Sequence, residues 1–307
     1  MMKNKDTYAV AVRRPDQEIA VDVQQYKSII PWETCKKIPF IRGIFNFVDS
    51  LVLGVKTLMF SASFFEEEED AELLTEEEAA AKEKKEQRIM TVTMIFSLVI
   101  ALALFMVLPY WLSSLIGKNI KSRYVLTLIE GVIRMAIFLG YIILISRMKD
   151  IQRTFMYHGA EHKCINCVEH GLPLTVENVL KSSRLHKRCG TSFLFLVMLV
   201  SIVLHFVFVL VPVYWVRLFG RLLMVPVVAG ISFEIIQWAG RTDSRFADIM
   251  SKPGLAMQKF TTKEPTADMA EVAIKAVEAV FDWRAYLKEE FDLDIPYETE
   301  ETENAES

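Results

Sequence analysis

Four long apolar runs set the pattern of hydrophobic and polar positions along this chain. They cover residues 90–108, 124–146, 191–211 and 222–240. A helix needs about 20 apolar residues to cross a bilayer, whereas helices of soluble proteins usually run about 8–20 residues. The pattern therefore predicts a mainly α-helical, multi-pass membrane protein with about four spans, paired as residues 89–146 and 191–240.

Residues 39–64 are also apolar, but three charges interrupt them. Arg42, Asp49 and Lys56 are seven residues apart, which is about two helical turns, so they share one face of a helix. This spacing favours an amphipathic helix that lies in the membrane interface or re-enters the membrane, rather than a fifth full span.

Residues 1–38 form a polar N-terminal segment with no apolar core, which predicts that no cleavable signal peptide opens the chain. Residues 9–12 and 18–23 have strand composition, and Pro15-Asp16 supplies a turn between them. The segment therefore predicts a small β-hairpin.

Residues 241–288 are predicted to form a cytoplasmic helical region. Asp268 and Glu271 resemble a capping box at the start of a helix. An apolar stripe follows, formed by Met269, Val272, Ala273, Ala276, Val277 and Val280. The stripe favours a helix that packs on the rest of the cytoplasmic domain.

Charge is distributed unevenly around a formal net charge of −4. Acidic side chains concentrate in residues 65–88, expected to be a solvated linker, and in residues 289–307, expected to be a disordered tail. Lys and Arg concentrate near the cytoplasmic ends of the spans and in residues 147–190. The positive-inside rule then predicts a cell-membrane protein with both termini and residues 147–190 in the cytoplasm. Because topology explains this basic charge, it does not indicate nucleic-acid binding.

The predicted cytoplasmic loop 147–190 holds four of the five histidines, at positions 158, 162, 170 and 186. On a helix, His158 and His162 face the same way and can bind one metal ion. Glu161 between them can act as general base on a metal-bound water. The order H-x-x-E-H is that of inverted zincins, so the sequence predicts a divalent metal site, with Zn²⁺ as the preferred ion.

A third metal ligand is needed, and Glu234 and His186 are the candidates. Glu234 lies near the cytoplasmic end of the fourth apolar run, and a carboxylate inside a span is costly and usually functional. Pro226 and Gly230 could kink that span and open space beside it. The alternative for Glu234 is an ion pair with Arg134 or with an arginine of a nearby loop.

A closed structural zinc site is a rival interpretation. Cys164-x-x-Cys167 and His186-x-x-Cys189 have spacings close to those of four-ligand zinc sites. The chain has four cysteines, too few for a disulfide framework, and reduced thiols are the simpler explanation for them.

Other ionisable groups inside the apolar runs have structural explanations. Glu130 and Arg134 are four residues apart and are expected to neutralise each other. His205 is expected to be a buried histidine with its hydrogen bonds satisfied. Ion transport through these charges and Glu234 has less support, because four spans with so few polar groups line a pore poorly.

Short motifs are distributed over most of the chain. They are A-V-R-R-P-D at 11–16, P-F-I-R-G at 39–43, D-S-L-V-L-G at 49–54, Y-H-G-A-E-H-K at 157–163, L-T-V-E-N at 174–178, S-R-L-H at 183–186, R-C-G-T-S-F at 188–193, A-G-I-S at 229–232 and P-G-L at 253–255. Together they resemble the YqhQ-like family of bacterial membrane proteins, described as predicted metal-dependent enzymes. The resemblance implies a polar site formed by His158, Glu161, His162, His186, Cys189 and Glu234. Cys164 and Cys167 are not part of the family motif, which favours the histidine–glutamate site over the closed zinc site.

Two functional hypotheses follow. The first is a metal-dependent, hydrolytic enzyme at the boundary between membrane and cytoplasm, with Glu161 as the base that activates water. The second is a non-enzymatic membrane scaffold or assembly factor, in which a polar or zinc cluster braces the 147–190 loop and the cytoplasmic face binds a protein partner. The chain has no phosphate loop, dinucleotide fingerprint or nucleophile elbow, so the sequence does not specify a substrate.

Overall fold

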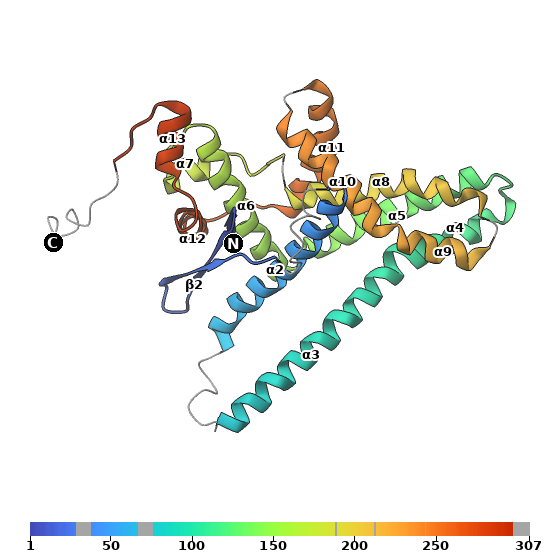
Figure 1. Cartoon of the computed structure of the whole chain (residues 1–307), viewed down its shortest axis with the longest axis horizontal. Helices are drawn as coiled ribbons and strands as arrows, with labels where there is room; N and C mark the ends of the chain where they lie inside the picture. Colours follow the sequence, from blue (N-terminus) through green and yellow to red (C-terminus); the bar gives the residue numbers. More distant parts are fainter. Residues whose placement is uncertain (29–37, 67–75, 188, 212, 243, 297–307) are drawn as a thin grey trace. The chain divides into compact units, whose positions relative to one another are not determined.

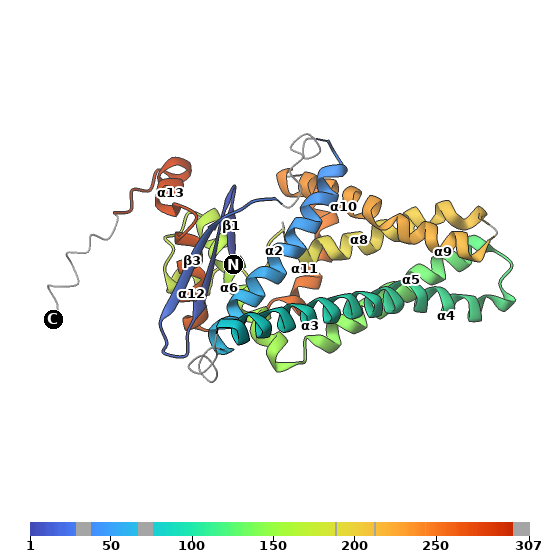
Figure 2. The same cartoon turned by 60° about the horizontal axis from the view of Figure 1, so that its bottom comes forward.

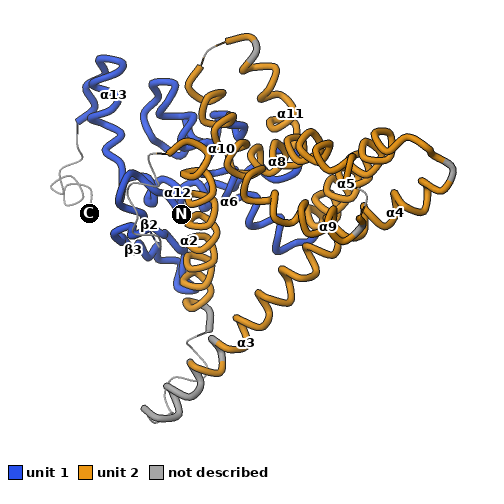
Figure 3. Tube along the Cα trace, turned by 45° about the vertical axis from the view of Figure 1, so that its right-hand side comes forward, with its two compact units in different colours: residues 1–29, 148–186, 258–307 blue, residues 30–147, 187–257 orange. Residues whose placement is uncertain are grey.

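The structure is a computed structural model that describes residues 1–28, 38–66, 76–187, 189–211, 213–242 and 244–296. It is mainly helical, with one small sheet (Figure 1). The chain forms two compact units (Figure 3). Unit 1 consists of Met1–Ile29, Met148–His186 and Gln258–Ser307, and unit 2 of Ile30–Arg147 and Lys187–Met257. Cys35, residues 67–75 of the predicted linker and residues 297–307 of the predicted tail lie outside the described residues.

Unit 1 combines the N-terminal sheet with short helices from the middle and the end of the chain. Its elements are β1 (Met2–Asn4), β2 (Thr7–Arg13), β3 (Ile19–Gln25), α6 (Lys149–Glu169), α7 (Val176–Lys181), α12 (Ala267–Glu278) and α13 (Trp283–Phe291). Residues 147–190, predicted as the cytoplasmic connection between the spans, are largely helical, and α6 contains the helical turn expected for His158 and His162.

The predicted β-hairpin is confirmed, and a third strand extends it. β2 and β3 pair antiparallel with Val10 opposite Asp22, and Arg14 N donates to Glu18 O at 2.8 Å across the turn. β1 adds to the other edge of β2, with Lys3 opposite Tyr8. Three residues are too short to show the period-2 alternation by which strands are recognised, so the sequence pattern missed β1.

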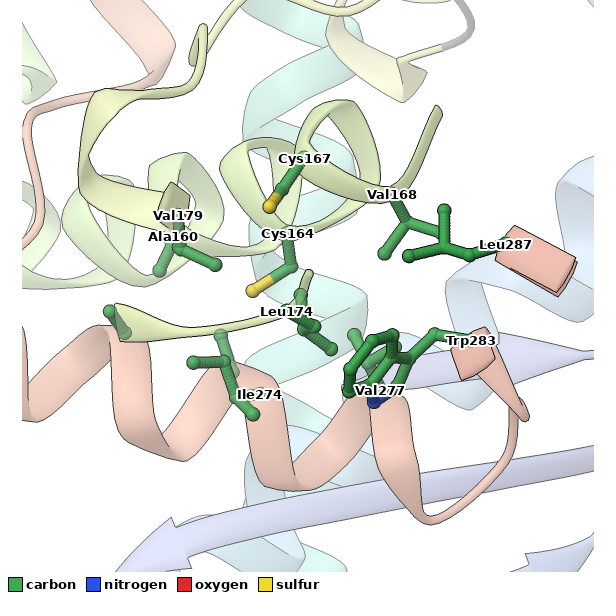
Figure 4. Packing of buried hydrophobic residues seen from close by; sticks show 12 residues of the cluster. Ala160, Cys164, Cys167, Val168, Leu174, Val179, Ile274, Val277, Trp283 and Leu287 are labelled. Carbon is green, nitrogen blue, oxygen red and sulfur yellow. The ribbon is translucent and has the colours of Figure 1, made fainter. Parts of the chain in front are cut away.

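The predicted stripe of α12 packs in the core of unit 1 (Figure 4). Ala273, Ile274 and Val277 lie against residues of α6, α7 and α13. The helix begins one residue earlier than predicted, with Thr266 at the N-cap position, so Asp268 is not the capping residue. A hydrogen bond with the Thr266 side chain lowers the pKa of Asp268. Glu271 pairs instead with Arg13 of β2, at 2.7 Å.

Unit 2 holds the long apolar helices (Figure 2). Its elements are α2 (Ile41–Glu66), α3 (Glu76–Leu102), the π-helix η1 (Ala103–Val107), α4 (Leu108–Ile116), the 3₁₀-helix η2 (Gly117–Asn119), α5 (Arg123–Ile145), α8 (Gly190–His205), the 3₁₀-helix η3 (Phe206–Leu210), α9 (Tyr214–Leu223), α10 (Val225–Arg241) and most of α11 (Arg245–Thr261). The predicted linker is helical from Glu76 onward. The P-G-L motif lies inside α11, within the region 241–288 that was predicted to be helical.

Among the described residues, five helical segments are long and apolar enough to cross a membrane. Four of them, residues 88–116, 123–145, 190–210 and 215–241, match the predicted spans. The fifth, Ile41–Phe64, was predicted as an amphipathic helix; by length and composition alone it also qualifies as a span.

Two glycines bring α2 and α10 into backbone contact within unit 2. A Cβ on Gly230 would lie 2.5 Å from Phe40 O, and one on Gly43 would lie 3.0 Å from Gly230 Cα. Pro226 lies in the first turn of α10, where its missing N–H costs no helical hydrogen bond. The predicted span 222–240 is interrupted at Met224, between α9 and α10, two residues before Pro226, whereas Gly230 lies inside α10 and serves close packing.

Candidate metal centre on α6

The two histidines of the H-x-x-E-H motif lie side by side on α6. Four residues separate His158 from His162, and the helical period places them one above the other. Their ring centroids are 4.4 Å apart. The prediction that both rings face the same way is therefore confirmed.

Backbone carbonyls orient both rings. His158 Nδ1 lies 3.0 Å from Thr261 O, and His162 Nδ1 lies 2.7 Å from Arg184 O. A carbonyl oxygen only accepts, so each Nδ1 carries the proton and each Nε2 carries the lone pair. Metal-binding histidines are oriented in this way by a hydrogen bond from the second ring nitrogen.

His186 lies next to this pair. Its ring centroid is 5.9 Å from that of His162, and its Nε2 lies 3.1 Å from Glu169 Oε2. Gln258 fixes the backbone of His186 from both sides, because its Oε1 accepts from His186 N at 2.9 Å and its Nε2 donates to His186 O at 2.7 Å. Three imidazoles are thus gathered in unit 1, each oriented by a second partner.

Two buried side chains of α6 bind the segment that carries His186. The sequence did not indicate a role for either of them. Lys163 Nζ donates to Leu180 O at 2.8 Å and to Ser182 O at 2.7 Å. Asn166 Nδ2 donates to Ser183 O at 2.6 Å and to Leu185 O at 3.0 Å. These contacts satisfy carbonyls that have no helical partner, and they hold Arg184 O within reach of His162. Their only signal in the sequence is their spacing from His162, one and four residues along the same helix.

Gly159 allows the segment around Lys263 to lie directly on α6. A Cβ on Gly159 would lie 2.1 Å from Lys263 O, which no side chain tolerates. In the same contact Lys263 N donates to Phe155 O at 2.9 Å. The close approach brings Thr261 O to His158.

Glu161, the predicted base, precedes His162 on α6. Its Oε1 accepts a hydrogen bond from Met1 N at 2.5 Å, and its side chain is 27% exposed. The carboxylate is therefore partly open to solvent, and it also pairs with the amino group of Met1.

Cys164 and Cys167 point to the other side of α6, into the hydrophobic core (Figure 4). Desolvation by burial raises the pKa of both thiols, which disfavours the thiolate that a zinc site requires. Cys167 Sγ lies 3.4 Å from Pro173 O. The closed four-ligand alternative thus loses two of its four proposed ligands.

Cys189 and Glu234, the remaining predicted ligands, belong to unit 2. Cys189 is buried at the N-cap of α8, where its Sγ accepts from Thr191 N at 3.4 Å. The Glu234 carboxylate binds Arg42, with Nε 2.6 Å from Oε1 and Nη2 2.5 Å from Oε2. Phe40 N also donates to Oε1 at 3.2 Å. The ion-pair alternative for Glu234 is thus observed, with Arg42 as partner rather than Arg134.

The Glu234 carboxylate stabilises an unusual backbone conformation at Phe40. Phe40 has a φ of 67°, a left-handed conformation that is strained for a bulky residue. Its N–H is bound by Glu234 immediately before α2 begins. Glu234 therefore anchors the start of α2 on α10.

Comparison with known proteins gives the family. A family model described as "Protein of unknown function (DUF1385)" matches residues 38–283. The chain belongs to this family. It is also 37% identical over 280 residues to "Uncharacterized protein YqhQ" of Bacillus subtilis (strain 168), a match that covers 90% of this chain and 87% of that protein. The resemblance drawn from the motifs is confirmed at the level of the family. No solved structure matches the chain.

Proposed function

We propose that this DUF1385 protein is a metal-dependent, hydrolytic enzyme whose centre lies on α6. The observation that carries the proposal is the pair His158 and His162, with ring centroids 4.4 Å apart and both Nδ1 atoms bound to backbone carbonyls. Rings that share one Zn²⁺ ion lie with their centres roughly 5 Å apart, given a Zn–N distance of about 2.1 Å. The pair fits such an ion, and its Nε2 lone pairs supply two ligands.

The third ligand comes from the segment 186–189. His186 has the carboxylate partner that is typical of zinc-binding histidines, since its Nε2 contacts Glu169. Cys189, buried at the N-cap of α8, stays a candidate. We do not include Glu234, because Arg42 binds both of its oxygens.

A bound Zn²⁺ ion would supply Lewis acidity and lower the pKa of a water molecule at the fourth position. The residues of the chain provide the rest of the chemistry. Glu161, adjacent to His162, accepts the proton of the attacking water and returns it to the leaving group. Lys163 and Asn166 keep the 180–185 segment against α6, which maintains the His162–Arg184 hydrogen bond.

The metal content of the purified full-length protein tests the proposal. We expect about one divalent ion per chain, and its loss in the double variant His158→Ala/His162→Ala, because two ligands are removed together. His170→Ala is the matched control: His170 follows directly after the last residue of the same helix, and its Nδ1 lies 2.7 Å from Asn166 O in its own turn. The variants His186→Ala and Cys189→Ala identify the third ligand, because the one that removes it should lose the ion. Glu234→Gln is expected to retain the ion.

A metal-free wild-type protein, prepared without chelators, would overturn the proposal.

The contacts between α6 and the 180–186 segment also support a second candidate, a non-enzymatic scaffold. Lys163, Asn166 and His162 all donate to backbone carbonyls of that segment, as expected of a structural brace. In this case the exposed face of unit 1 binds a protein partner.

The variant Glu161→Gln separates the two candidates. The substitution keeps the size of the side chain but removes the base, so an enzyme loses activity or its cellular phenotype by about 100-fold or more while keeping metal and fold. A scaffold tolerates the change. Complementation of a deletion strain, with metal content and circular dichroism as controls, decides between them.

The long apolar helices support placement of the protein in the cell membrane. The positive-inside rule supports both termini and unit 1 on the cytoplasmic side. The lipid bilayer is then the first partner of the chain.

A further inference from the structure

Unit 2 contains a buried charge cluster that its apolar sequence only partly predicts. Glu130 and Arg134 of α5 form the expected pair, with Oε1 and Nη2 2.7 Å apart. Arg221 of α9 donates to the second oxygen of Glu130. All three side chains are at most 5% exposed.

His205 does not add a charge to this cluster. Arg134 Nη1 lies 2.7 Å from His205 Nδ1, and a guanidinium only donates, so the ring nitrogen accepts. Arg134 Nε donates to Phe105 O in the π-helix η1, at 3.0 Å. The expectation that His205 is buried and hydrogen-bonded is confirmed, and each of the three side-chain nitrogens of Arg134 has a protein partner.

The other two arginines, Arg217 and Arg221, each have a side-chain nitrogen without such a partner in the residues that the structure describes. Arg217 and Arg221 lie one turn apart on α9, and their guanidinium carbons are 5.6 and 5.1 Å from the centre of the Tyr110 ring. The Nε atoms of both are buried and have no hydrogen-bond partner among the described residues. Glu130 is the one carboxylate that pairs with this group in the described part of the chain, and Arg134 and Arg221 share it.

The cluster therefore has three guanidinium groups and one carboxylate. Positive charges four residues apart on a helix repel each other, and a surplus charge among apolar helices is costly unless a counter-ion binds. The planar guanidinium fork matches phosphate oxygens in a bidentate geometry. Tyr110 stacks on both arginines and fixes their orientation.

We propose that Arg217 and Arg221, held over Tyr110, bind a phosphate group. Arg221 is buried, whereas Arg217 is partly exposed and can meet a ligand from outside. α9 begins at the same end of unit 2 as the α4–α5 connection (Figure 1; Figure 2). The phosphate comes from a lipid headgroup or from free phosphate. Only the lipid source depends on the proposed membrane location, and neither depends on the metal centre.

The test uses the full-length protein in lipid-free detergent micelles. Inorganic phosphate and short-chain phosphatidylglycerol are titrated separately, and the thermal midpoint gives the apparent affinity. We expect at least one of them to stabilise the wild type. Stabilisation by phosphatidylglycerol alone assigns the site to a lipid headgroup, and stabilisation by phosphate assigns it to the free anion. If neither stabilises the wild type, the proposal is overturned.

Arg217→Gln is expected to weaken the binding about tenfold, the loss of one charge-assisted hydrogen bond. Arg123→Gln is the matched control, because it removes the same charge from an exposed position at the start of α5, and it should bind as the wild type does. An equal effect of both variants overturns the proposal. If Arg217→Gln does not fold, Arg217→Lys decides: it keeps the charge but loses the fork, so weaker binding supports the site and unchanged binding overturns it.

Discussion

At the scale of single residues, the arrangement on α6 depends on groups whose partners are distant in sequence. Glycine at position 159 matters because of the carbonyl of Lys263, which would lie 2.1 Å from a Cβ there. His158 and His162 are oriented by carbonyls 103 and 22 residues away. The sequence predicted the histidine pair because helical periodicity is local, but it could not predict which carbonyls orient the rings.

Gly159→Ala should therefore destabilise unit 1. The added methyl group forces the Lys263 segment away from α6, and overpacking of this kind costs about 1–3 kcal/mol of the free energy of unfolding. Chemical denaturation followed by circular dichroism measures the change. Gly140→Ala is the matched control, since a Cβ there meets no atom within 4 Å, and a helical alanine is favoured by about 0.5–1 kcal/mol. Equal stability of the two variants would show that the close approach is not present in solution.

At the scale of elements, α6 combines two faces with different chemistry. One carries His158 and His162, and the other buries Cys164 and Cys167 in the core. The sequence did not show which face of this helix is buried, because its packing partners include residues of α12 and α13, about 100 residues or more later. Long apolar helices such as α5 and α8 were predicted well, since their composition alone identifies them.

The buried thiols give a pH dependence of definite sign. Burial raises the folded-state pKa of Cys164 and Cys167 above the unfolded value of 9.0. Above that pH the unfolded chain releases thiol protons that the folded chain keeps, so stability falls with rising pH. The slope reaches at most about 1.4 kcal/mol per pH unit for each thiol.

Thermal midpoints between pH 7 and pH 10.5 measure this dependence. The double variant Cys164→Ala/Cys167→Ala should be less stable throughout, because it leaves cavities in the core, but its midpoint should change less steeply above pH 9. Parallel pH profiles for wild type and variant would show that the two buried thiols do not cause the loss of stability at high pH.

At the scale of the whole molecule, unit 1 restricts the number of membrane crossings. Asn4 Nδ2 donates to Val280 O at 2.9 Å, and Arg13 pairs with Glu271 at 2.7 Å. The N-terminal sheet, residues 148–186 and the C-terminal helices therefore fold together, and in the proposed membrane location they lie on one side of the bilayer. An even number of crossings must separate residue 29 from residue 148, although three candidate spans lie there. α2 carries four charges, so we expect it to be the helix that does not cross, as an interfacial or re-entrant helix would not.

Labelling of introduced cysteines tests this topology. Lys84→Cys, at an exposed position of α3, should lie on the cytoplasmic side with unit 1, so a membrane-impermeant maleimide should not reach it in intact cells. Lys118→Cys, exposed between α4 and α5, should be labelled. Labelling of Lys84→Cys from outside would mean that α2 crosses the membrane.

The sequence by itself determined the helical class, four of the candidate spans, the hairpin, the histidine pair and the family, because each depends on composition, short-range periodicity or short motifs. Only the tertiary structure decided that Glu234 binds Arg42, that Arg221 joins Glu130, and that three separate stretches of chain form unit 1. Hydrogen bonds and ion pairs are directional and short, so their partners are fixed by how the helices pack, and this information is not present in any local stretch of sequence.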